Sequence, residues 1–434
     1  MTTATIAEPG RSAVIGDDVG LILAGPTAAE GPEPLISFLS RSGAPPVFSR
    51  AGTLDALRLS GVQGRGGGAF PLWRKVQAAL DAPGRPMLIV NCSESEPASR
   101  KDWTLCTLRP HLMLEGAVRL ATLVGADEVV LHLHRGAAEP TDSLRHALLE
   151  RREVMEGDPA WRLSSGPHGY VTGEASAVAR YVHEGVAKPV FSSVPMARRG
   201  PSGRPTLVCN AETVAHVAVI LRIGAEAWRS FGSESCPGPQ LVTLAGAVPL
   251  PGSVVEVAGA PTIGEILRRA GVDDPPLAVL VGGYAGTWIR GHVAWRTPLE
   301  PTALARLGAF RGCGLLGVLP HGACGLRETA RVTAFLAGET AGQCGPCVHG
   351  LPALAESVSR LARGTAGSRT VRRLRRTSNA LVGSGACAHP DGVVHMVRSA
   401  LDVFDYDVIR HRAGSPCPPA DHPSLFPVPA VRAS

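Results

Sequence analysis

Short apolar runs alternate with helix-like stripes through the first half of the chain. Runs that suit buried strands lie at residues 87–90, 128–133 and 205–208. Apolar residues at helical spacing follow them, as in Leu114, Val118 and Ala121, and again over 175–182 and after 213. Strands that alternate with helices in this way predict an α/β domain, which we assign to residues 49–235.

The pattern changes after a link rich in glycine and proline at 233–240. Two short strands, a helix and a third strand are expected within some 45 residues, which favours a small β-grasp-like unit. We assign residues 239–330 to this unit and to the segment that connects it to the next domain. Apolar stripes then predict a helical domain at 331–434, through Leu351, Leu354, Val358 and Leu361, and through Val393, Val397, Leu401 and Phe404. Residues 1–48, rich in Gly, Pro and Ala, are interpreted as a loose N-terminal arm.

Composition narrows the class of protein. With 434 residues the chain is long enough for two to four domains. No apolar run approaches the roughly 18 residues of a membrane span, and the N-terminus lacks the pattern of a signal peptide, so a cytoplasmic protein is expected. Its ten cysteines are then thiols or metal ligands rather than disulfides. A net charge of +6 and 4% aromatic residues disfavour nucleic acid as a partner.

A glycine-rich loop is the first candidate site. Gly64-Arg65-Gly66-Gly67-Gly68-Ala69-Phe70-Pro71 bares the backbone, so main-chain N–H groups can approach a flat or anionic ligand. Lys75 follows on the predicted helix and is one of only three lysines among 43 basic residues. The loop matches neither the dinucleotide fingerprint nor a P-loop, and a plain glycine-rich turn is the alternative.

Polar residues follow several of the predicted strands. Open α/β sheets bind ligands beyond the carboxyl ends of their strands. Any one of these carboxylates is better explained as a helix cap, but together they suit a polar cofactor. The set comprises Asn91, Glu94, Glu96, Glu174, Asn210 and Glu212.

Cys344-Gly345-Pro346-Cys347 is the sharpest chemical signal. Two thiolates at this spacing can share a metal centre, and Cys387 is the natural third ligand. A redox dithiol or two buried thiols would use the same spacing. Further candidate ligands, each more easily explained as structural, are His349, His389, Cys313 and Cys324. An arginine run at 369–376 is either a solvated helix face or a docking site for an acidic electron-transfer partner.

Five segments resemble, in order, motifs of the NADH-oxidising flavoprotein (F) subunit of respiratory complex I and its relatives in NAD-linked hydrogenases and formate dehydrogenases. The resemblance covers roughly residues 50–410. The family patterns are G-R-G-G-A-G-F-P, N-x-D-E-x-E-P-G-T-x-K-D, Y-x-x-G-E-E-T-A, P-T-x-V-N-N-V-E-T and E-S-C-G-x-C-x-P-C. They match residues 64–71, 91–102, 170–177, 205–213 and 339–347.

This resemblance implies a Rossmann-like FMN domain with NADH stacked on the flavin, an SLBB-type β-grasp unit and a helical iron–sulfur domain. Electrons would pass from NAD(P)H through FMN to the cluster and on to a ferredoxin-like or membrane acceptor. By the resemblance, Cys344, Cys347 and Cys387 ligate a [4Fe-4S] or [3Fe-4S] cluster, and Glu96 and Lys75 act in catalysis, with Phe70 and Glu96 facing NADH. The implied cofactor contacts are Gly64, Arg65, Gly66, Gly67, Phe70, Lys75, Asn91, Glu94, Tyr170, Gly173, Glu174, Asn210 and Thr213.

Several positions depart from the family pattern. Ala341 replaces the first cluster cysteine and Ala175 replaces the second glutamate of G-E-E, while Ser93 and Cys209 replace Asp and Asn beside the flavin. The divergence favours a stand-alone paralogue. Two alternatives stay open: a cofactor-poor scaffold, and a flavoprotein with zinc at Cys344, Cys347, Cys387 and His389.

Overall fold

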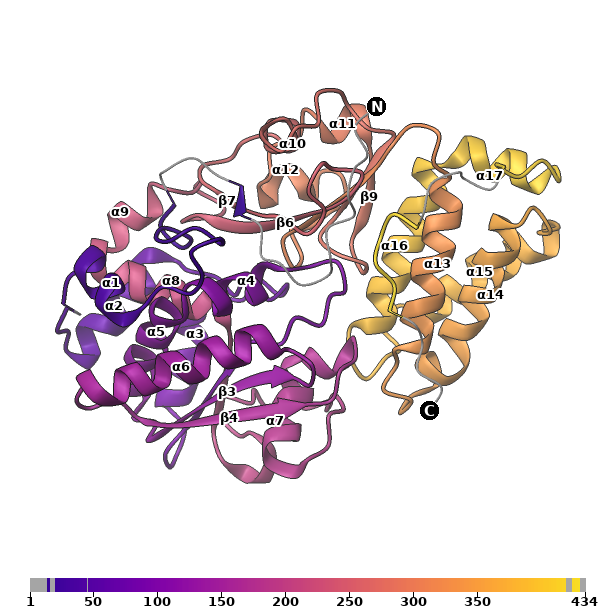
Figure 1. The fold of residues 1–434 in the computed structure, drawn as a ribbon. Coiled ribbons are helices and arrows are strands. Elements are labelled where there is room, and N and C mark those ends of the chain that lie inside the picture. Colours follow the sequence, from indigo (N-terminus) through magenta and orange to yellow (C-terminus); the bar gives the residue numbers. More distant parts are fainter. Residues whose placement is uncertain (1–13, 16–19, 45, 419–423, 430–434) are drawn as a thin grey trace.

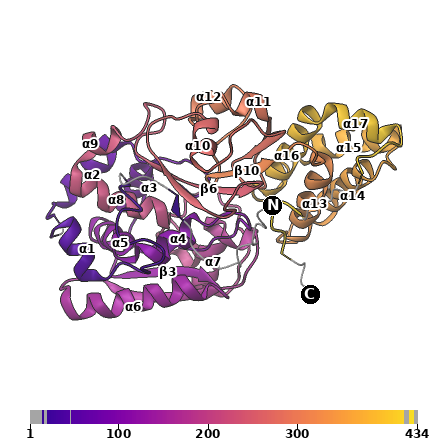
Figure 2. The ribbon, with the colours of Figure 1, turned by 45° about the horizontal axis from the view of Figure 1, so that its top comes forward.

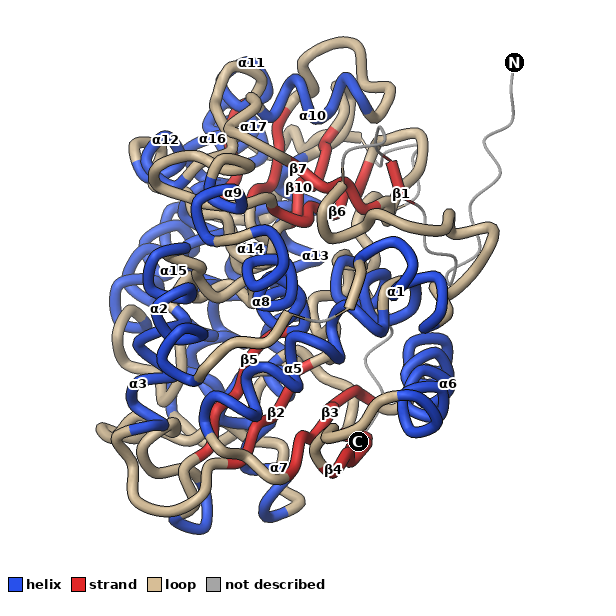
Figure 3. Tube along the Cα trace, turned by 90° about the vertical axis from the view of Figure 1, so that its left-hand side faces the viewer, coloured by secondary structure: helices blue, strands red, loops and turns tan. Residues whose placement is uncertain are grey.

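The computed structural model describes the chain except for residues 1–13, 16–19, 45, 419–423 and 430–434. A parallel four-stranded sheet and a mixed six-stranded sheet lie in separate layers, and a helical domain stands beside them (Figures 1 and 3). The expected Rossmann-like sheet and helical C-terminal region are confirmed.

The four-stranded sheet has the order β4-β3-β2-β5, with all three pairings parallel. Its two central strands, β2 and β3, and the neighbouring β5 are largely buried and mainly apolar, as expected of strands covered on both faces, whereas the edge strand β4 is of mixed polarity. Leu88 and Val90 of β2 pack into the main core, whereas Ile89 faces a smaller cluster with Val178 of α7. The bounds are β2 (Met87–Asn91), β3 (Glu128–His134), β4 (Ala160–Gly166), β5 (Thr206–Asn210) and α7 (Ala175–Glu184).

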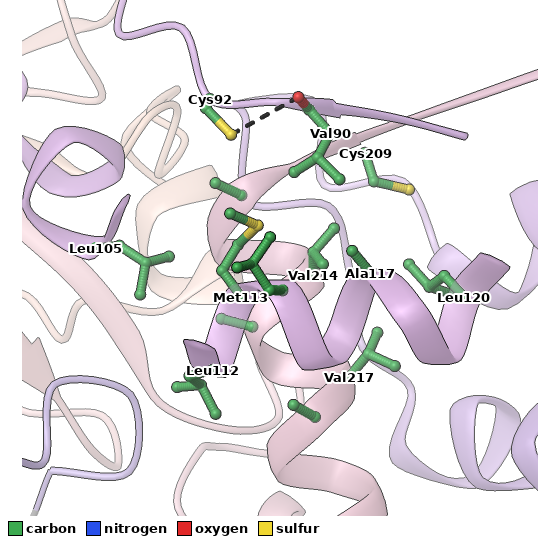
Figure 4. Packing of buried hydrophobic residues seen from close by; sticks show 14 of the residues in the cluster. Val90, Cys92, Leu105, Leu112, Met113, Ala117, Leu120, Cys209, Val214 and Val217 are labelled. Carbon is green, nitrogen blue, oxygen red and sulfur yellow. Dashed lines mark hydrogen bonds between the residues drawn. The ribbon is translucent and has the colours of Figure 1, made fainter. Parts of the chain in front are cut away.

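The main core is built on a close pair of helices (Figure 4). A Cβ at Gly116 would lie 1.9 Å from the carbonyl oxygen of Val214, so only glycine allows α5 to pack this tightly on α8. The helices of this domain are α1 (Leu35–Ser42), α2 (Arg50–Ser60), α3 (Leu72–Leu80), α4 (Lys101–Leu108), α5 (Pro110–Val124), α6 (Ala138–Val154), α8 (Ala211–Ile223) and α9 (Ala225–Arg229).

The six-stranded sheet has the order β1-β7-β6-β10-β8-β9. Val279 and Val281 face one core with α10, while Leu280 and Trp288 face another core shared with the helical domain. Figure 2 shows this sheet between α10 and α16. The bounds are β1 (Val14–Ile15), β6 (Gln240–Gly246), β7 (Val254–Val257), α10 (Ile263–Arg269), β8 (Ala278–Val281), β9 (Thr287–Arg290), α11 (Gly291–Ala294), α12 (Pro301–Ala305) and β10 (Leu315–Leu319).

The helical domain follows, with its apolar stripes facing inward as the periodicity predicts. It contains α13 (Gly325–Gly338), α14 (Leu351–Ala362), α15 (Ser368–Leu381), α16 (His389–Val403) and α17 (Asp405–Arg412). Within the described ranges, no helix is both long enough and apolar enough to cross a membrane.

The interpretation of residues 1–48 as a loose arm is wrong for part of this stretch. Phe38 of α1 is fully buried, and so is Ile22. The carboxylate of Glu256 accepts hydrogen bonds from the backbone N–H groups of residues 21–23 at 2.8–3.0 Å. One partly buried carboxylate of β7 thus fixes this segment to the six-stranded sheet.

Candidate functional site

The strand order places a ligand site between β2 and β5. The chain runs outward from β2 through β3 to β4, then returns to the other side of β2 as β5. Such a switch point leaves a crevice at the carboxyl ends of the two strands. Asn91 ends β2 and is the register partner of Asn210, which ends β5. Both side chains line a cavity of about 740 Å³, within the usual size range for cofactors.

The glycine-rich loop forms one wall of this cavity. Its ends are joined by a hydrogen bond from the Gly64 N–H to the Phe70 carbonyl at 2.9 Å. Gly67 has φ +105°, a conformation that favours glycine, and a Cβ at Gly68 would meet no atom within 4 Å. A Cβ at Gly66 would lie 3.3 Å from Cβ of Asn210. The bare backbone therefore faces open space, as a flat cofactor requires.

Most of the predicted cofactor residues converge here. Asn91 donates to the Gly173 carbonyl at 2.9 Å, and Lys75 Nζ donates to the Val208 carbonyl at 3.3 Å. Glu174 caps α7: its carboxylate accepts hydrogen bonds from the N–H groups of Ser176 and Ala177 and so supplies the negative charge that this helix N-terminus favours. The predicted residues that line the cavity are Gly64, Gly66, Gly67, Phe70, Lys75, Asn91, Glu96, Tyr170, Gly173, Glu174, Asn210 and Thr213.

Glu96 is the buried acid of this site. Its Oε2 accepts from the Tyr284 N–H at 2.9 Å and from the Tyr170 hydroxyl at 3.2 Å, whereas Oε1 is buried with no hydrogen-bond partner in the described chain. Burial raises the pKa of Glu96 to about 8, although both donors oppose the shift. Near neutral pH the carboxyl is therefore largely uncharged.

Two predicted contacts do not reach the cavity. The Arg65 side chain turns away and donates to the carbonyls of Pro237 and Pro239 at 2.9 and 3.1 Å, while its backbone N–H donates to Thr213. Arg65 thereby holds the loop against α8 and the link to β6. Glu94 accepts from the N–H groups at the start of α4, at 2.8 and 3.3 Å, and is a helix cap.

A buried ionic cluster lies beneath the site, and its assembly was not predicted. Lys101 Nζ lies 2.8 Å from Asp102 and 3.0 Å from Glu212, all three side chains being almost fully buried. Asn210, in turn, donates to Asp102 at 2.7 Å. Burial lowers the pKa of Lys101, but the carboxylates of Asp102 and Glu212 raise it by more, so the pKa lies above its usual value. The cluster holds the end of β5 in place.

The six-stranded sheet contributes a wall that the sequence analysis missed. Gly282 follows β8 and lines the cavity with Phe310, Gly312 and Cys313. A Cβ at Gly283 would lie 2.6 Å from Oε2 of Glu96, so this glycine makes room for the buried acid. Its signal in the sequence is the glycine pair directly after a buried strand.

The three predicted metal-ligand cysteines come together at the edge of the same cavity. Burial and the neighbouring sulfurs of Cys344 and Cys387 raise the pKa of Cys347 to about 12. Cys387 lines the cavity itself. The loop is fixed to the α/β domain by Glu339, whose carboxylate accepts from the Tyr170 N–H at 2.8 Å.

Ala341 occupies a further corner of this cysteine site. Its backbone N–H is directed at the Cys347 sulfur, and its side chain is nearly buried. His389 offers another donor: Nε2 bonds the Leu336 carbonyl at 2.9 Å, and the buried Nδ1 has no partner among the described residues. A metal-bound histidine typically has this arrangement. Three thiols close to one another and an imidazole nitrogen with no partner among the described residues are donor types that iron–sulfur clusters accept.

A single zinc ion fits these cysteines less well. Tetrahedral zinc holds two thiolate sulfurs about 3.8 Å apart. In the described chain, the one group of three ligand atoms gathered within 4.8 Å is Cys324, His411 and Cys417. Cys324 thus belongs to a different cluster, Cys313 lies in the cofactor cavity, and His349 is exposed.

Comparison with known proteins agrees with this geometry. Residues 57–219 match the Nuo51 FMN-binding domain, and residues 327–411 match the NADH-ubiquinone oxidoreductase-F iron-sulfur binding region. The FMN-binding match thus includes the glycine-rich loop, and the iron-sulfur match includes Cys344, Cys347 and Cys387.

Relatives match along most of their length. The chain is 28% identical to the F subunit of NADH-quinone oxidoreductase in Mycobacterium tuberculosis, over 84% of this chain and 85% of that protein. Its identity to the corresponding Streptomyces coelicolor protein is 29%, over 83% and 82%. A solved NAD⁺-reducing [NiFe]-hydrogenase superposes with TM-score 0.79 at 26% identity, covering 90% of this chain and 68% of that one. Along most of its length the chain is therefore similar to NADH-quinone oxidoreductase F subunits, and it contains matches to their FMN-binding and iron-sulfur binding regions.

Proposed function

We propose that this protein oxidises NADH or NADPH in the cavity at the switch point and passes the electrons through its cysteine site to a second redox protein. When bound there, FMN accepts a hydride as an electron pair and releases the electrons singly. The observation that carries the proposal is continuity: one cavity is lined both by the glycine-rich loop and by Cys387 and His389.

The residues of the chain act by placement and by electrostatics. The bare backbone of the glycine-rich loop and the Lys75 ammonium favour the anionic end of a flavin nucleotide. Phe70, 47% exposed at the mouth, offers an aromatic face for the nicotinamide. Glu96 keeps its proton near neutral pH, so it presents an uncharged carboxyl to the dinucleotide.

The positive charge of α15, beside the loop that carries Cys344 and Cys347, supports an acidic, ferredoxin-like acceptor. Five arginines of α15 are exposed, and α15 packs against the π-helical turn Pro346–Gly350, which carries Cys347. Complementary charge speeds such encounters and makes them sensitive to salt. The exposed arginines are Arg369, Arg372, Arg373, Arg375 and Arg376.

The test is anaerobic purification and reconstitution with FMN, iron and sulfide, followed by flavin and metal counts and by bleaching of the visible spectrum on addition of NADH. Bound flavin and iron that NADH reduces support the proposal. A colourless protein after reconstitution refutes the proposal and supports the alternative of a cofactor-poor scaffold. Lys75→Ala should lower the flavin content, whereas Lys188→Ala should not if the cavity is the site, because Lys188 is exposed and does not line the cavity.

A further inference from the structure

A second group of potential metal ligands lies at the other end of the helical domain from the cysteine site. Cys324 directly precedes α13, His411 lies in the last turn of α17, and Cys417 follows on the C-terminal segment. The 14 residues of α13 separate Cys324 from the cysteine-site loop by about 20 Å. We propose that Cys324, His411 and Cys417 bind a structural zinc ion that ties the C-terminal segment to α13.

The distances between the ligand atoms suit a tetrahedral ion. The Cys324 sulfur lies 3.7 Å from Nε2 of His411, and the Cys417 sulfur lies 3.2 Å from the same nitrogen. Zinc bound by thiolate and imidazole holds sulfur and nitrogen about 3.6 Å apart. All three ligand atoms fall within 4.8 Å of one another, although they come from segments up to 93 residues apart in the sequence.

The histidine is oriented as a ligand. Nδ1 of His411 lies 3.1 Å from the Leu361 carbonyl, which fixes the proton on that nitrogen and turns the lone pair of Nε2 toward the two sulfurs. The Cys417 N–H donates to the same Nε2 at 2.9 Å. Metal binding therefore requires the backbone at Cys417 to turn and release this bond.

The surroundings favour a thiolate at Cys324 and exclude water from two of the three ligands. Cys324 stands at the N-terminus of α13, where the helix dipole stabilises a negative sulfur. Cys324 and His411 are buried in the helical core, and Cys417 is half-buried. Asp407 lies 3.5 Å from the Cys417 sulfur and is the candidate fourth ligand, with water as the substitute.

The site has a clear structural use. Beyond Cys417, Phe426 is fully buried against Tyr284 and Trp288. An ion at Cys417 would give the C-terminal segment a second anchor, next to α13 and α17. The free energy of zinc binding would then contribute to the folding stability of this end of the domain.

The experiment must separate this site from Cys344, Cys347 and Cys387. In the full chain with these three changed to Ser, we expect about one zinc ion per chain by elemental analysis. Adding Cys417→Ser or His411→Gln should remove it, whereas adding Cys106→Ser, which deletes a buried thiol elsewhere, should not. Asp407→Asn should weaken zinc binding if the carboxylate is the fourth ligand and leave it unchanged if water is.

Cobalt gives a readout that needs no change at the site. Cobalt added to this triple variant should give thiolate-to-metal charge transfer and the visible bands of tetrahedral coordination. Absence of zinc and of these bands refutes the proposal. So does a Cys324–Cys417 disulfide found by mass spectrometry in freshly purified protein. Neither result bears on FMN or iron, so the proposed function would stand.

Discussion

Glu96→Gln tests the electrostatics of the cavity directly. The buried carboxyl has a pKa of about 8 in the folded protein, against 4.5 for an ordinary glutamate. Between these two pH values the folded state keeps a proton that the unfolded chain has released. Folding stability should therefore fall as pH rises through this window, and the loss should be complete above about pH 8.

The magnitude follows from the same two values. Each pH unit within the window changes the free energy of unfolding by about 1.4 kcal/mol, so the whole window amounts to at most roughly 5 kcal/mol. Glutamine cannot ionise, yet its carbonyl oxygen can still accept from the Tyr284 N–H and the Tyr170 hydroxyl. The variant should thus lack this pH slope and gain stability relative to the parent as pH rises.

Thermal and urea unfolding of parent and variant at several pH values between about 5 and 9 measure this difference. Glu153→Gln is the matched control, because Glu153 is exposed on α6 and should leave the slope unchanged. If parent and Glu96→Gln give parallel stability profiles, the carboxyl ionises normally and our account of the cavity is wrong.

Three further predictions concern the cofactors. Gly66→Val should abolish most FMN binding, because the branched side chain enters the space between the loop and Asn210; parental flavin content would contradict this. Ala175 lines the cavity, so Ala175→Glu should repel the 2′-phosphate of NADPH and shift preference toward NADH by about fivefold or more, for roughly 1 kcal/mol or more of like-charge repulsion at an effective dielectric of 20. An unchanged ratio of kcat/KM for the two nucleotides would refute it. Ala341→Cys should raise iron per chain and slow cluster loss in air.

Much of the local structure was determined by the sequence alone. Short continuous apolar runs specified β2, β3 and β5, because only strands buried on both faces need such runs. Helical spacing specified α5, α7 and the stripes of α14 and α16. The glycine-rich loop and the Cys344-x-x-Cys347 pair could also be recognised, since each constrains a few adjacent residues.

Other elements left weaker signals. β4 has mixed polarity, with residues that are mostly only partly buried, and it therefore does not stand out from a loop. Helix α1, residues 35–42, is held in place by the packing of Phe38 against the ring of His111, a contact that composition cannot show. The direction of the Arg65 side chain likewise depends on carbonyls 172 and 174 residues away.

Tertiary structure alone decided which distant groups meet. Because Gly283 has no side chain, the Glu96 carboxyl can be buried beside it. That burial, rather than any neighbour in sequence, raises the pKa of Glu96. The same holds for Cys324, which sequence reasoning grouped with Cys344 but which lies beside His411 and Cys417. Periodicity reports which face of an element is buried, but not what that face is buried against. Site chemistry depends on those partners, because desolvation and short-range contacts act only between groups that the fold has brought together.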